Sequence, residues 1–353
     1  MLVLCASARV RECARAALTP GHDIIVIGGS AGAVQPLRRI VQDLPPDLPA
    51  AVFIVLHVGR TSILADILAR SGTIRVVRAE SGAEIVPGTV YVAPPGRHLL
   101  LHEQHILLRR GPHENLARPA IDPLFRSAAA TFGARVVGVV LSGALNDGTA
   151  GLHAVKRCGG IAVVQDPADA DVGDMPRSAL RRVAMDHCVA VADMSKLLAR
   201  LASTPPGPTP PIPPDIRLEA TIAAQELATM ASEDRLGTPS RFACPECHGA
   251  LWEIDDGAGL RYRCHVGHAY SGEAMEAAQA DRIEETLWIL MRAHQERAAL
   301  VRRLAGQAAT PQQQADYRRR AEAYQEDAEI VGRFILDRSM SAGSGGLLGD
   351  DAV

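Results

Sequence analysis

Three polar residues have the side-chain types that a serine hydrolase needs, and each comes just after a short apolar run. Ser30, His57 and Asp147 follow the runs at 24–27, 52–56 and 136–141, respectively. Serine is a weak nucleophile until an imidazole takes its proton, and the imidazole needs a carboxylate that fixes its tautomer. These three residue types therefore favour acyl transfer through a covalent serine intermediate.

The serine lies in the sequence Gly-Gly-Ser-Ala-Gly at 28–32, between an apolar run and a helical pattern. This matches G-x-S-x-G, in which small neighbours allow a sharp turn that exposes the serine oxygen. Taken alone, Ser30 would more often cap the following helix. A dinucleotide-binding fingerprint fits less well, because Ser30 replaces its middle glycine and the next strand ends in His57 instead of an acidic residue.

His57 and Asp147 are also ambiguous when each is considered singly. A lone histidine is more often structural than a base, and an aspartate before a glycine is commonly a turn former or N-cap. Their conjunction with Ser30 changes this interpretation, because ligands gather at the carboxyl ends of parallel strands. The chain order serine, histidine, aspartate, with one strand ahead of the serine, disfavours the α/β-hydrolase superfamily.

The elements that must position these residues alternate between apolar runs and helical patterns from Asp23 to about Leu201. Such alternation predicts an α/β fold with a doubly wound, mostly parallel sheet. Near 90–108 the alternation is interrupted by Pro-Pro-Gly and by two apolar runs around Glu103 and Gln104, which predict a β-hairpin. We expect this hairpin to make the sheet mixed.

A proline-rich segment at 203–214 divides the sequence. It has few backbone donors, so it predicts an extended spacer between domains. We therefore assign 1–202 to a catalytic domain. Beyond the spacer we expect a zinc-ribbon-like module with a leading helix at 215–271, a helical hairpin at 272–338 and a disordered tail at 339–353.

The second helix of the hairpin has a clear predicted start. Thr310, Pro311 and Gln313 supply an N-cap, an N1 proline and a capping-box partner. From Tyr317 to Ile335 apolar residues recur at spacings of four and three. This seam predicts packing against the preceding helix, and a coiled-coil partner is the alternative.

Three of the seven cysteines gather with histidine in the predicted module. Cys244 and Cys247 form a C-x2-C pair, while Cys264 and His268 form a C-x3-H pair, with His265 as an alternative fourth ligand. Thiolates and imidazole at this spacing predict a tetrahedral zinc site. Four protein ligands leave no position for water, so we interpret the Zn²⁺ as structural and expect catalysis to need no cofactor.

Composition restricts the classes of partner and the compartment. The net charge of −3 gives no electrostatic footprint for nucleic acid. No apolar run approaches the roughly 20 residues that span a bilayer, so we do not expect membrane insertion. The odd number of cysteines, with three crowded together, argues against a disulfide framework and favours a reducing cytoplasm.

Five separated motifs occur in order between Asp23 and Leu201, a stretch that makes up about half of the chain. They are Ile-Ile-Val-Ile-Gly-Gly-Ser-Ala-Gly at 24–32, Leu-His at 56–57, Arg-Pro-Ala-Ile-Asp at 118–122, Leu-Ser-Gly with Asn-Asp-Gly at 141–148, and Met-Pro-Arg at 175–177. In sequence and spacing they resemble the catalytic domain of chemotaxis-type protein-glutamate methylesterases.

The resemblance implies hydrolysis of glutamate γ-methyl esters on chemoreceptor helices, with release of methanol, and in some members deamidation of glutamine. It places Ser30, His57 and Asp147 at the positions of nucleophile, base and orienting carboxylate. The partners that it implies are methylated chemoreceptor helices. A non-catalytic signalling scaffold, which binds partners through its zinc and helical region, is the alternative function.

The remaining site residues are predicted around the expected acyl-transfer chemistry. Oxyanion donors are expected from the N–H of Ala31, at a helix N-terminus, and from the stretch that includes Ala144 and Leu145. Arg118 and Arg177 are candidates for holding an acidic peptide, with surface ion pairing as the alternative.

The sequence also departs from the family pattern. Ala31 replaces a frequent threonine, Ala33 replaces a glycine, and Ala144 and Leu145 replace methionine and glycine. Only 22 residues precede Asp23, so we expect a stand-alone member without a receiver domain. Regulation would then come from a separate receiver or methyltransferase protein, or from the C-terminal region.

Overall fold

The computed structural model describes residues 21–59, 61–225, 236–257 and 259–343. The chain forms two compact units, with the boundary between Met275 and Glu276. The first unit contains the central sheet, the segment predicted to be a spacer and a small second sheet, whereas the second consists of long helices. The predicted limits at 203–214 therefore fall within the first unit.

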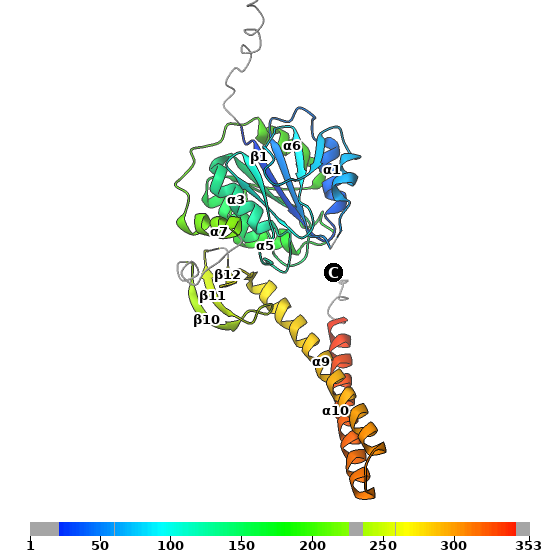
Figure 1. Cartoon of the computed structure of the whole chain (residues 1–353). Coiled ribbons are helices and arrows are strands. Elements are labelled where there is room, and N and C mark those ends of the chain that lie inside the picture. Colours follow the sequence, from blue (N-terminus) through cyan, green and yellow to red (C-terminus); the bar gives the residue numbers. More distant parts are fainter. Residues whose placement is uncertain (1–20, 60, 226–235, 258, 344–353) are drawn as a thin grey trace, which may run out of the picture. The chain divides into compact units, whose positions relative to one another are not determined.

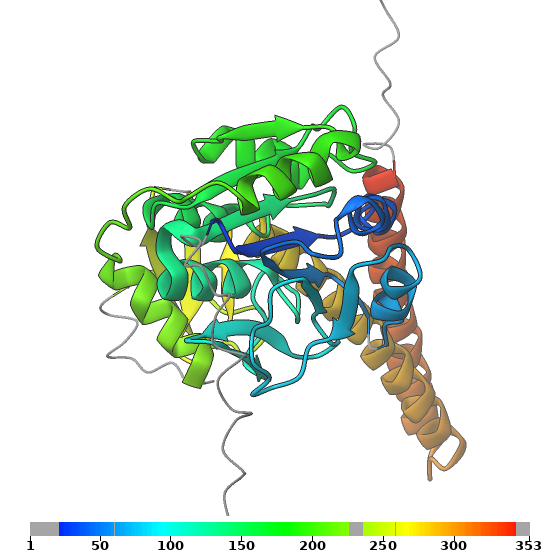
Figure 2. The ribbon, with the colours of Figure 1, turned by 90° about the horizontal axis from the view of Figure 1, so that it is seen from above.

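A seven-stranded sheet forms the centre of the first unit, with β1 in its middle (Figures 1 and 2). Every neighbouring pair of its strands is parallel. The strands in the middle of the sheet are continuous runs of buried, mostly apolar residues, as expected where helices cover both faces. In spatial order they are β3 (Arg75–Arg78), β4 (Thr89–Val92), β2 (Ala51–Leu56), β1 (Ile24–Gly29), β7 (Val136–Val140), β8 (Ile161–Gln165) and β9 (His187–Val189).

Alternate residues of the strands face two different helix layers. Ile24 and Val26 pack into the core shared with the first layer, whereas Ile25 and Ile27 pack into the core of the second. Figure 1 shows α3 on one side of the sheet and α1 and α6 on the other, which confirms the doubly wound fold. The first layer is α3 (Ile121–Phe132), α4 (Thr149–Arg157) and α5 (Asp174–Arg182), and the second is α1 (Val34–Asp43), α2 (Leu64–Ala69) and α6 (Val191–Ala202).

The predicted hairpin is present as β5 (His98–His102) and β6 (His105–Arg109), but it forms a sheet of its own. The prediction that it makes the central sheet mixed was wrong. Side chains of α3 satisfy the backbone of Leu101: Ser127 Oγ accepts from its N–H at 3.1 Å, and Thr131 Oγ1 donates to its carbonyl at 3.1 Å. The hairpin therefore packs on α3 instead of extending the central sheet.

The segment after α6 lies along the first unit. Thr209 Oγ1 accepts from the N–H of Ala134 at 3.3 Å, and α7 (Pro214–Gln225) contacts α3. A four-stranded antiparallel sheet follows in the order β10 (Thr238–Ala243), β11 (Ala250–Asp255), β12 (Leu260–Cys264) and β13 (Ala269–Ser271). We call residues 236–271 the Cys/His module.

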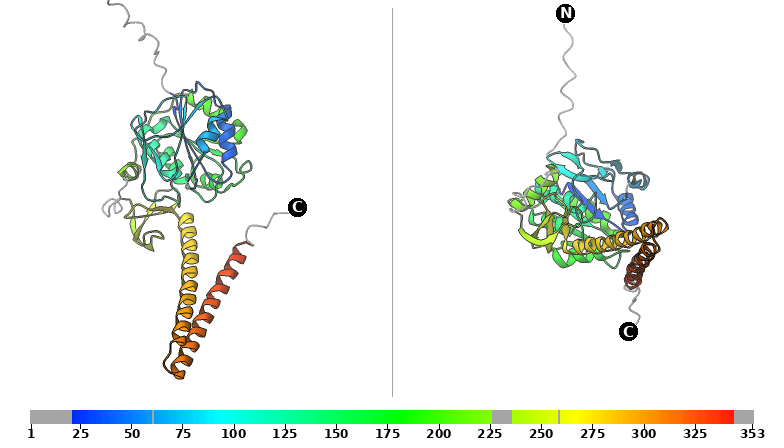
Figure 3. Two further views of the ribbon diagram at one scale, coloured as in Figure 1. Left: turned by 45° about the vertical axis from the view of Figure 1, so that its right-hand side comes forward. Right: turned by 60° about the horizontal axis from the view of Figure 1, so that its bottom comes forward.

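Two long helices, α9 (Gly272–Gly306) and α10 (Pro311–Gly343), form the predicted helical hairpin (Figure 3). Thr310 Oγ1 accepts from the N–H of Gln313 at 3.2 Å, which confirms the predicted N-cap. Arg297 donates to the Tyr324 hydroxyl at 2.8 Å and covers its ring, so the predicted seam does face the preceding helix. Helix α10 extends into the segment predicted to be a disordered tail, and residues 344–353 lie outside the described part.

Candidate active site

The site lies where the winding of the central sheet reverses. From β1 the chain first builds the β2 side of the sheet, and it later returns to place β7 against the other edge of β1. In open α/β sheets such a switch point leaves a crevice at the carboxyl ends of the strands. The N–H of Ser30, just after β1, donates to the carbonyl of Ser142, just after β7, at 2.9 Å.

A tight turn presents the serine. The N–H of Ala33 donates to the carbonyl of Ser30 at 3.1 Å, and Gly32 between them has a positive φ of 79°. Since a Cβ on Gly32 would lie 2.6 Å from Ser142 Oγ, glycine is needed there both for the backbone conformation and for space. Helix α1 begins only at Val34, so Ala31 belongs to the turn and not, as predicted, to a helix N-terminus.

The structure brings Ser30, His57 and Asp147 into one hydrogen-bonded chain. His57 Nδ1 lies 3.1 Å from Ser30 Oγ, and His57 Nε2 lies 2.7 Å from Asp147 Oδ2. If Nε2 carries the proton and donates it to the carboxylate, the lone pair of Nδ1 faces the serine hydroxyl. This geometry lets the imidazole take the hydroxyl proton, whereas the carboxylate fixes the tautomer.

Asp147 is buried among hydrogen-bond donors. Its Oδ2 also accepts from the N–H of Ile121 at 2.7 Å, and its Oδ1 accepts from the Gly148 N–H at 2.9 Å and from Asn115 Nδ2 at 2.8 Å. Burial acts to raise the pKa of Asp147, but the His57 ring and these donors outweigh it and lower the pKa below its usual range. Asp147 is therefore an ionised carboxylate facing the imidazole.

A second buried carboxyl lies beside Asp147. Asp122 accepts from the N–H groups of Gly151 at 2.6 Å and Gly148 at 3.0 Å, and from Asn115 Nδ2 at 2.9 Å. Burial, followed by the charge of Asp147, raises the pKa of Asp122 to about 7. Their environments thus divide the neighbouring carboxyls into one that stays ionised and one that holds a proton more tightly.

Ser30 and His57 line a cavity of about 750 Å³. Of the predicted oxyanion residues, Ala144 and Leu145 line it, whereas the neighbouring Gly143 N–H is already bonded to the Val172 carbonyl at 2.9 Å. The wall also includes Pro95, Gly96, Arg110, His113, Asn115 and Arg118. The geometry does not test the roles of Ala31, Ala144 and Leu145 as oxyanion donors, so these stay predictions.

The two arginines predicted to hold substrate occupy different places. Arg118 lines the cavity, where one guanidinium nitrogen donates to the carbonyl of Gly111 at 2.6 Å. Arg177, on α5, does not line it; it lies 3.7 Å from the Asp174 carboxylate with more than half of its side chain exposed. A substrate-binding role is geometrically available to Arg118, whereas Arg177 has the surface ion pair that was its alternative.

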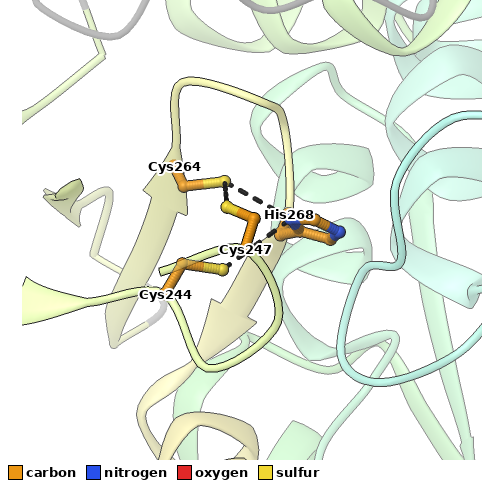
Figure 4. A group of neighbouring side chains, drawn as sticks. All are labelled: Cys244, Cys247, Cys264 and His268. Carbon is orange, nitrogen blue, oxygen red and sulfur yellow. Dashed lines mark hydrogen bonds between the residues drawn. The ribbon is translucent and has the colours of Figure 1, made fainter. Parts of the chain in front are cut away.

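Figure 4 shows a second cluster, in the Cys/His module, in which Cys244, Cys247, Cys264 and His268 converge. His268 Nδ1 lies 3.5 Å from Cys264 Sγ and 3.7 Å from Cys244 Sγ, and the sulfurs of Cys247 and Cys264 are 3.6 Å apart. All four ligand atoms lie within 4.8 Å of one another, and His265 is not in the group. The cluster has the composition and spacing to hold a metal ion.

The sequence pattern predicts no role for Asn115 and Asp122, the polar neighbours of Asp147. Asp122 belongs to the Arg-Pro-Ala-Ile-Asp motif at 118–122, but the motif does not indicate what the aspartate does. Asn115 lies in an irregular loop after β6, and no pattern in the sequence connects it with Asp147. Only their hydrogen bonds show that both belong to the site.

Comparisons with known proteins agree on one family. The model of the CheB methylesterase family matches residues 25–198. A putative protein-glutamate methylesterase/protein-glutamine glutaminase of Leptospira interrogans is 38% identical over 183 residues, which cover 51% of this chain and 95% of that protein. Protein-glutamate methylesterase/protein-glutamine glutaminase 2 of Anaeromyxobacter dehalogenans is 37% identical over 195 residues, covering 55% of this chain and 57% of the relative.

A solved structure is also similar. The crystal structure of the Thermotoga maritima CheB methylesterase catalytic domain is 32% identical and has a TM-score of 0.49, with 51% of this chain and 98% of that chain covered. The match to 95% of the Leptospira relative carries the assignment, and the range 25–198 matched by the family model spans the positions of the serine, the histidine and the aspartate described above. This chain belongs to the CheB methylesterase family.

Proposed function

We propose that this protein is a protein-glutamate methylesterase in which Ser30, His57 and Asp147 are the catalytic triad. The observation that carries the proposal is the hydrogen-bonded chain from Ser30 Oγ through His57 to buried Asp147, with the serine and histidine in an open cavity. The substrates would be glutamate γ-methyl esters on chemoreceptor helices, in keeping with the activity in the names of the relatives.

The reaction proceeds by acyl transfer. Ser30 Oγ attacks the ester carbonyl while His57 Nδ1 takes the hydroxyl proton, and Asp147 stabilises the imidazolium that forms. The tetrahedral intermediate collapses as the imidazolium gives its proton to the leaving methoxide, which departs as methanol. Water, deprotonated by the same imidazole, then hydrolyses the acyl-enzyme and restores the serine.

The same steps apply to a glutamine side chain, with ammonia as the leaving group, so we include glutaminase activity in the proposal. The Ala144 and Leu145 amides are the proposed oxyanion donors, because both residues line the cavity. Arg118 is proposed to attract the acidic residues of a receptor helix. We propose that a separate receiver or methyltransferase protein regulates the enzyme.

A cytoplasmic location is part of the same proposal. No helix in the described ranges is long and apolar enough to cross a bilayer. None of the cysteines in the described ranges forms a disulfide, which suits a reducing compartment.

We further propose that the Cys/His cluster binds a structural Zn²⁺. Two thiolates bound tetrahedrally at about 2.3 Å would lie roughly 3.8 Å apart, close to the 3.6 Å between the sulfurs of Cys247 and Cys264. His268 directs Nδ1 at the sulfurs while its Nε2 lies 3.2 Å from the Glu246 carboxylate. Such a carboxylate on the outer nitrogen commonly orients a histidine ligand.

Metal analysis of the full chain tests this site. We expect one zinc per chain in protein prepared without chelator, and a loss of most of it in Cys247→Ser. His265→Ala is the matched control, since this neighbouring histidine is outside the cluster. Wild-type protein without zinc, or equal zinc loss in both variants, would contradict the assignment.

The catalytic proposal is tested by demethylation of a methylated receptor preparation, with methanol as the measured product. Wild-type protein should release methanol and react with a fluorophosphonate probe at Ser30, whereas Ser30→Ala should do neither. Correctly folded wild-type protein that neither reacts nor releases methanol would favour the signalling scaffold.

A further inference from the structure

The Cys/His module lies directly against the loop that carries Asn115. The N–H of Ala269 donates to the carbonyl of His113 at 3.2 Å, and the N–H of Asn115 donates to the carbonyl of Ala269 at 2.8 Å. Two residues further along β13, the N–H of Ser271 donates to Asn115 Oδ1 at 2.9 Å. Strand β13 thus fixes both the backbone and the side chain of Asn115.

This contact determines which way the Asn115 amide points. Because its oxygen faces the Ser271 N–H, its Nδ2 must face the opposite side, where it donates to Asp147 Oδ1 at 2.8 Å and to Asp122 Oδ2 at 2.9 Å. Asn115 also has a φ of 49°, in the left-handed region that asparagine tolerates better than most residues. One side chain therefore joins the module to the triad carboxylate.

A second contact reaches the loop before Asp147. Ser271 Oγ donates to Asn146 Oδ1 at 2.6 Å, and Asn146 Nδ2 donates to the Glu273 carboxylate at 2.7 Å. The residue ahead of Asp147 is therefore held by the end of β13 and the first turn of α9. All these residues lie within the first compact unit.

Buried ion pairs fasten the module in this place. Arg263 on β12 is 1% exposed and contacts the carboxylates of Glu114 at 3.2 Å and of Glu219 on α7 at 2.9 Å. Glu114 is also paired with Arg126 of α3. Charges buried this deeply need their partners, so the network favours one docked position of the module.

The metal-binding cluster is adjacent to the same contacts. The proposed ligand His268 precedes Ala269 in the chain, and its carbonyl accepts from the N–H of Cys264 at 2.9 Å. Glu246, beside His268 Nε2, also lies 2.9 Å from His113 Nδ1. His113 lines the cavity, so a metal ion in the cluster would brace both β13 and part of the cavity wall.

We propose that the Cys/His module is a positioning element of the active site, and that β13 acts on Asp147 through Asn115. Metal binding and esterase activity are then coupled in this chain. The module lies outside residues 25–198, the part matched by the family model. The inference rests on the proposed function, since it assumes that Asp147 orients a catalytic His57.

The first test compares Asn115→Ala with His153→Ala in the full chain. Both residues contact the Cys/His module, but His153 does so through Asp256, by a 3.0 Å contact that does not lead to Asp147. We expect labelling of Ser30 by a fluorophosphonate to slow about 10-fold to 100-fold in Asn115→Ala, because a hydrogen bond to a buried charge is lost. His153→Ala should label at the wild-type rate.

Two further readouts separate positioning from a general loss of structure. The slowing should appear in the maximal rate of labelling and not in the probe concentration at half-maximal rate. The low-field proton resonance expected for the His57–Asp147 hydrogen bond should shift or disappear in Asn115→Ala and remain in His153→Ala. Equal labelling rates and an unchanged resonance in a folded Asn115→Ala protein would overturn the proposal.

The second test removes zinc from wild-type protein with a chelator and then restores it. We expect labelling to be about tenfold slower after zinc removal and to recover with added Zn²⁺. The response should be smaller in Asn115→Ala, because this variant already lacks the side chain that connects Ser271 with Asp147. An equal labelling rate with and without zinc in a folded chain would overturn the proposed coupling. If the metal-free chain unfolds, the comparison of Asn115→Ala with His153→Ala decides, and absence of labelling in zinc-loaded wild type would instead refute the proposed function.

Discussion

Replacing Asp147 with asparagine should disable the site while changing few atoms. Every group described around its carboxylate is a donor: His57 Nε2 and the Ile121 N–H face Oδ2, whereas the Gly148 N–H and Asn115 Nδ2 face Oδ1. An asparagine amide must therefore turn its NH2 group toward donors whichever way it is oriented.

Each orientation has a distinct cost. With the NH2 group toward His57, the imidazole must accept at Nε2 and carry its proton on Nδ1, where it can no longer take the proton of Ser30. With the NH2 group at the Oδ1 position, the buried Asp122 N–H loses its acceptor at 3.3 Å, and the Gly148 N–H keeps only Asp122 Oδ1. Either way, a buried donor is left unpaired, at about 1–3 kcal/mol for each such group.

We expect the kcat of Asp147→Asn to fall by about 10⁴, the size of the effect of the same substitution in a serine protease triad. The free energy of unfolding should fall by about 2–4 kcal/mol, since one or two buried donors lose their acceptors. Methanol release from a methylated receptor measures the first quantity, and urea denaturation measures the second.

Asp122→Asn is the matched control, because it makes the same change beside the triad at a carboxyl that does not contact His57. It should retain far more activity than Asp147→Asn. If folded Asp147→Asn protein kept a kcat within tenfold of wild type, Asp147 would not be the residue that orients the base.

Three other substitutions probe pH dependence, packing and substrate binding. Because the pKa of Asp122 is raised from 3.8 to about 7, its favourable contribution to folding is complete below pH 3.8 and is lost as pH rises through 7. Between pH 5 and pH 8, wild type should therefore lose on the order of 2 kcal/mol of unfolding free energy relative to Asp122→Asn, as measured by urea titration. A Cβ on Gly143 would lie 2.1 Å from the Met175 sulfur and 2.8 Å from Ser30 Cβ. Gly143→Ala should therefore lower the free energy of unfolding by about 1–3 kcal/mol and slow fluorophosphonate labelling of Ser30. An unchanged melting temperature would contradict this. Arg118→Ala should raise the KM for methylated receptor while Arg177→Ala leaves it unchanged, since only Arg118 lines the cavity; equal effects would show that substrate binding extends beyond the cavity.

Local sequence determined the positions of Ser30 and His57 at the carboxyl ends of their strands. An apolar run long enough to cross a sheet precedes each of them, and the glycine at 32 allows the turn that Ser30 needs. In a parallel sheet these positions lie at one edge, so the convergence of the two side chains was predictable before their distance was known.

The same local signals were insufficient for the hairpin at 98–109. Its apolar runs and turn predicted two antiparallel strands, and these are present. Whether their outer edge pairs with the central sheet depends on competing acceptors and donors, here Ser127 and Thr131 of α3. A pattern of hydrophobic residues contains no information about that competition.

Tertiary structure alone distinguished Arg118 from Arg177 and brought Asn115 into the site. Both arginines belong to recognisable motifs, but only the packing of the loop after β6 places Arg118 at the cavity, whereas α5 directs Arg177 to an ion pair at the surface. Asn115 is joined to Ser271 and to Asp147 by hydrogen bonds between segments far apart in the sequence. Propensity and periodicity are properties of neighbouring residues, so they predict elements and the residues at their ends, whereas contacts between distant loops are decided only when the chain packs.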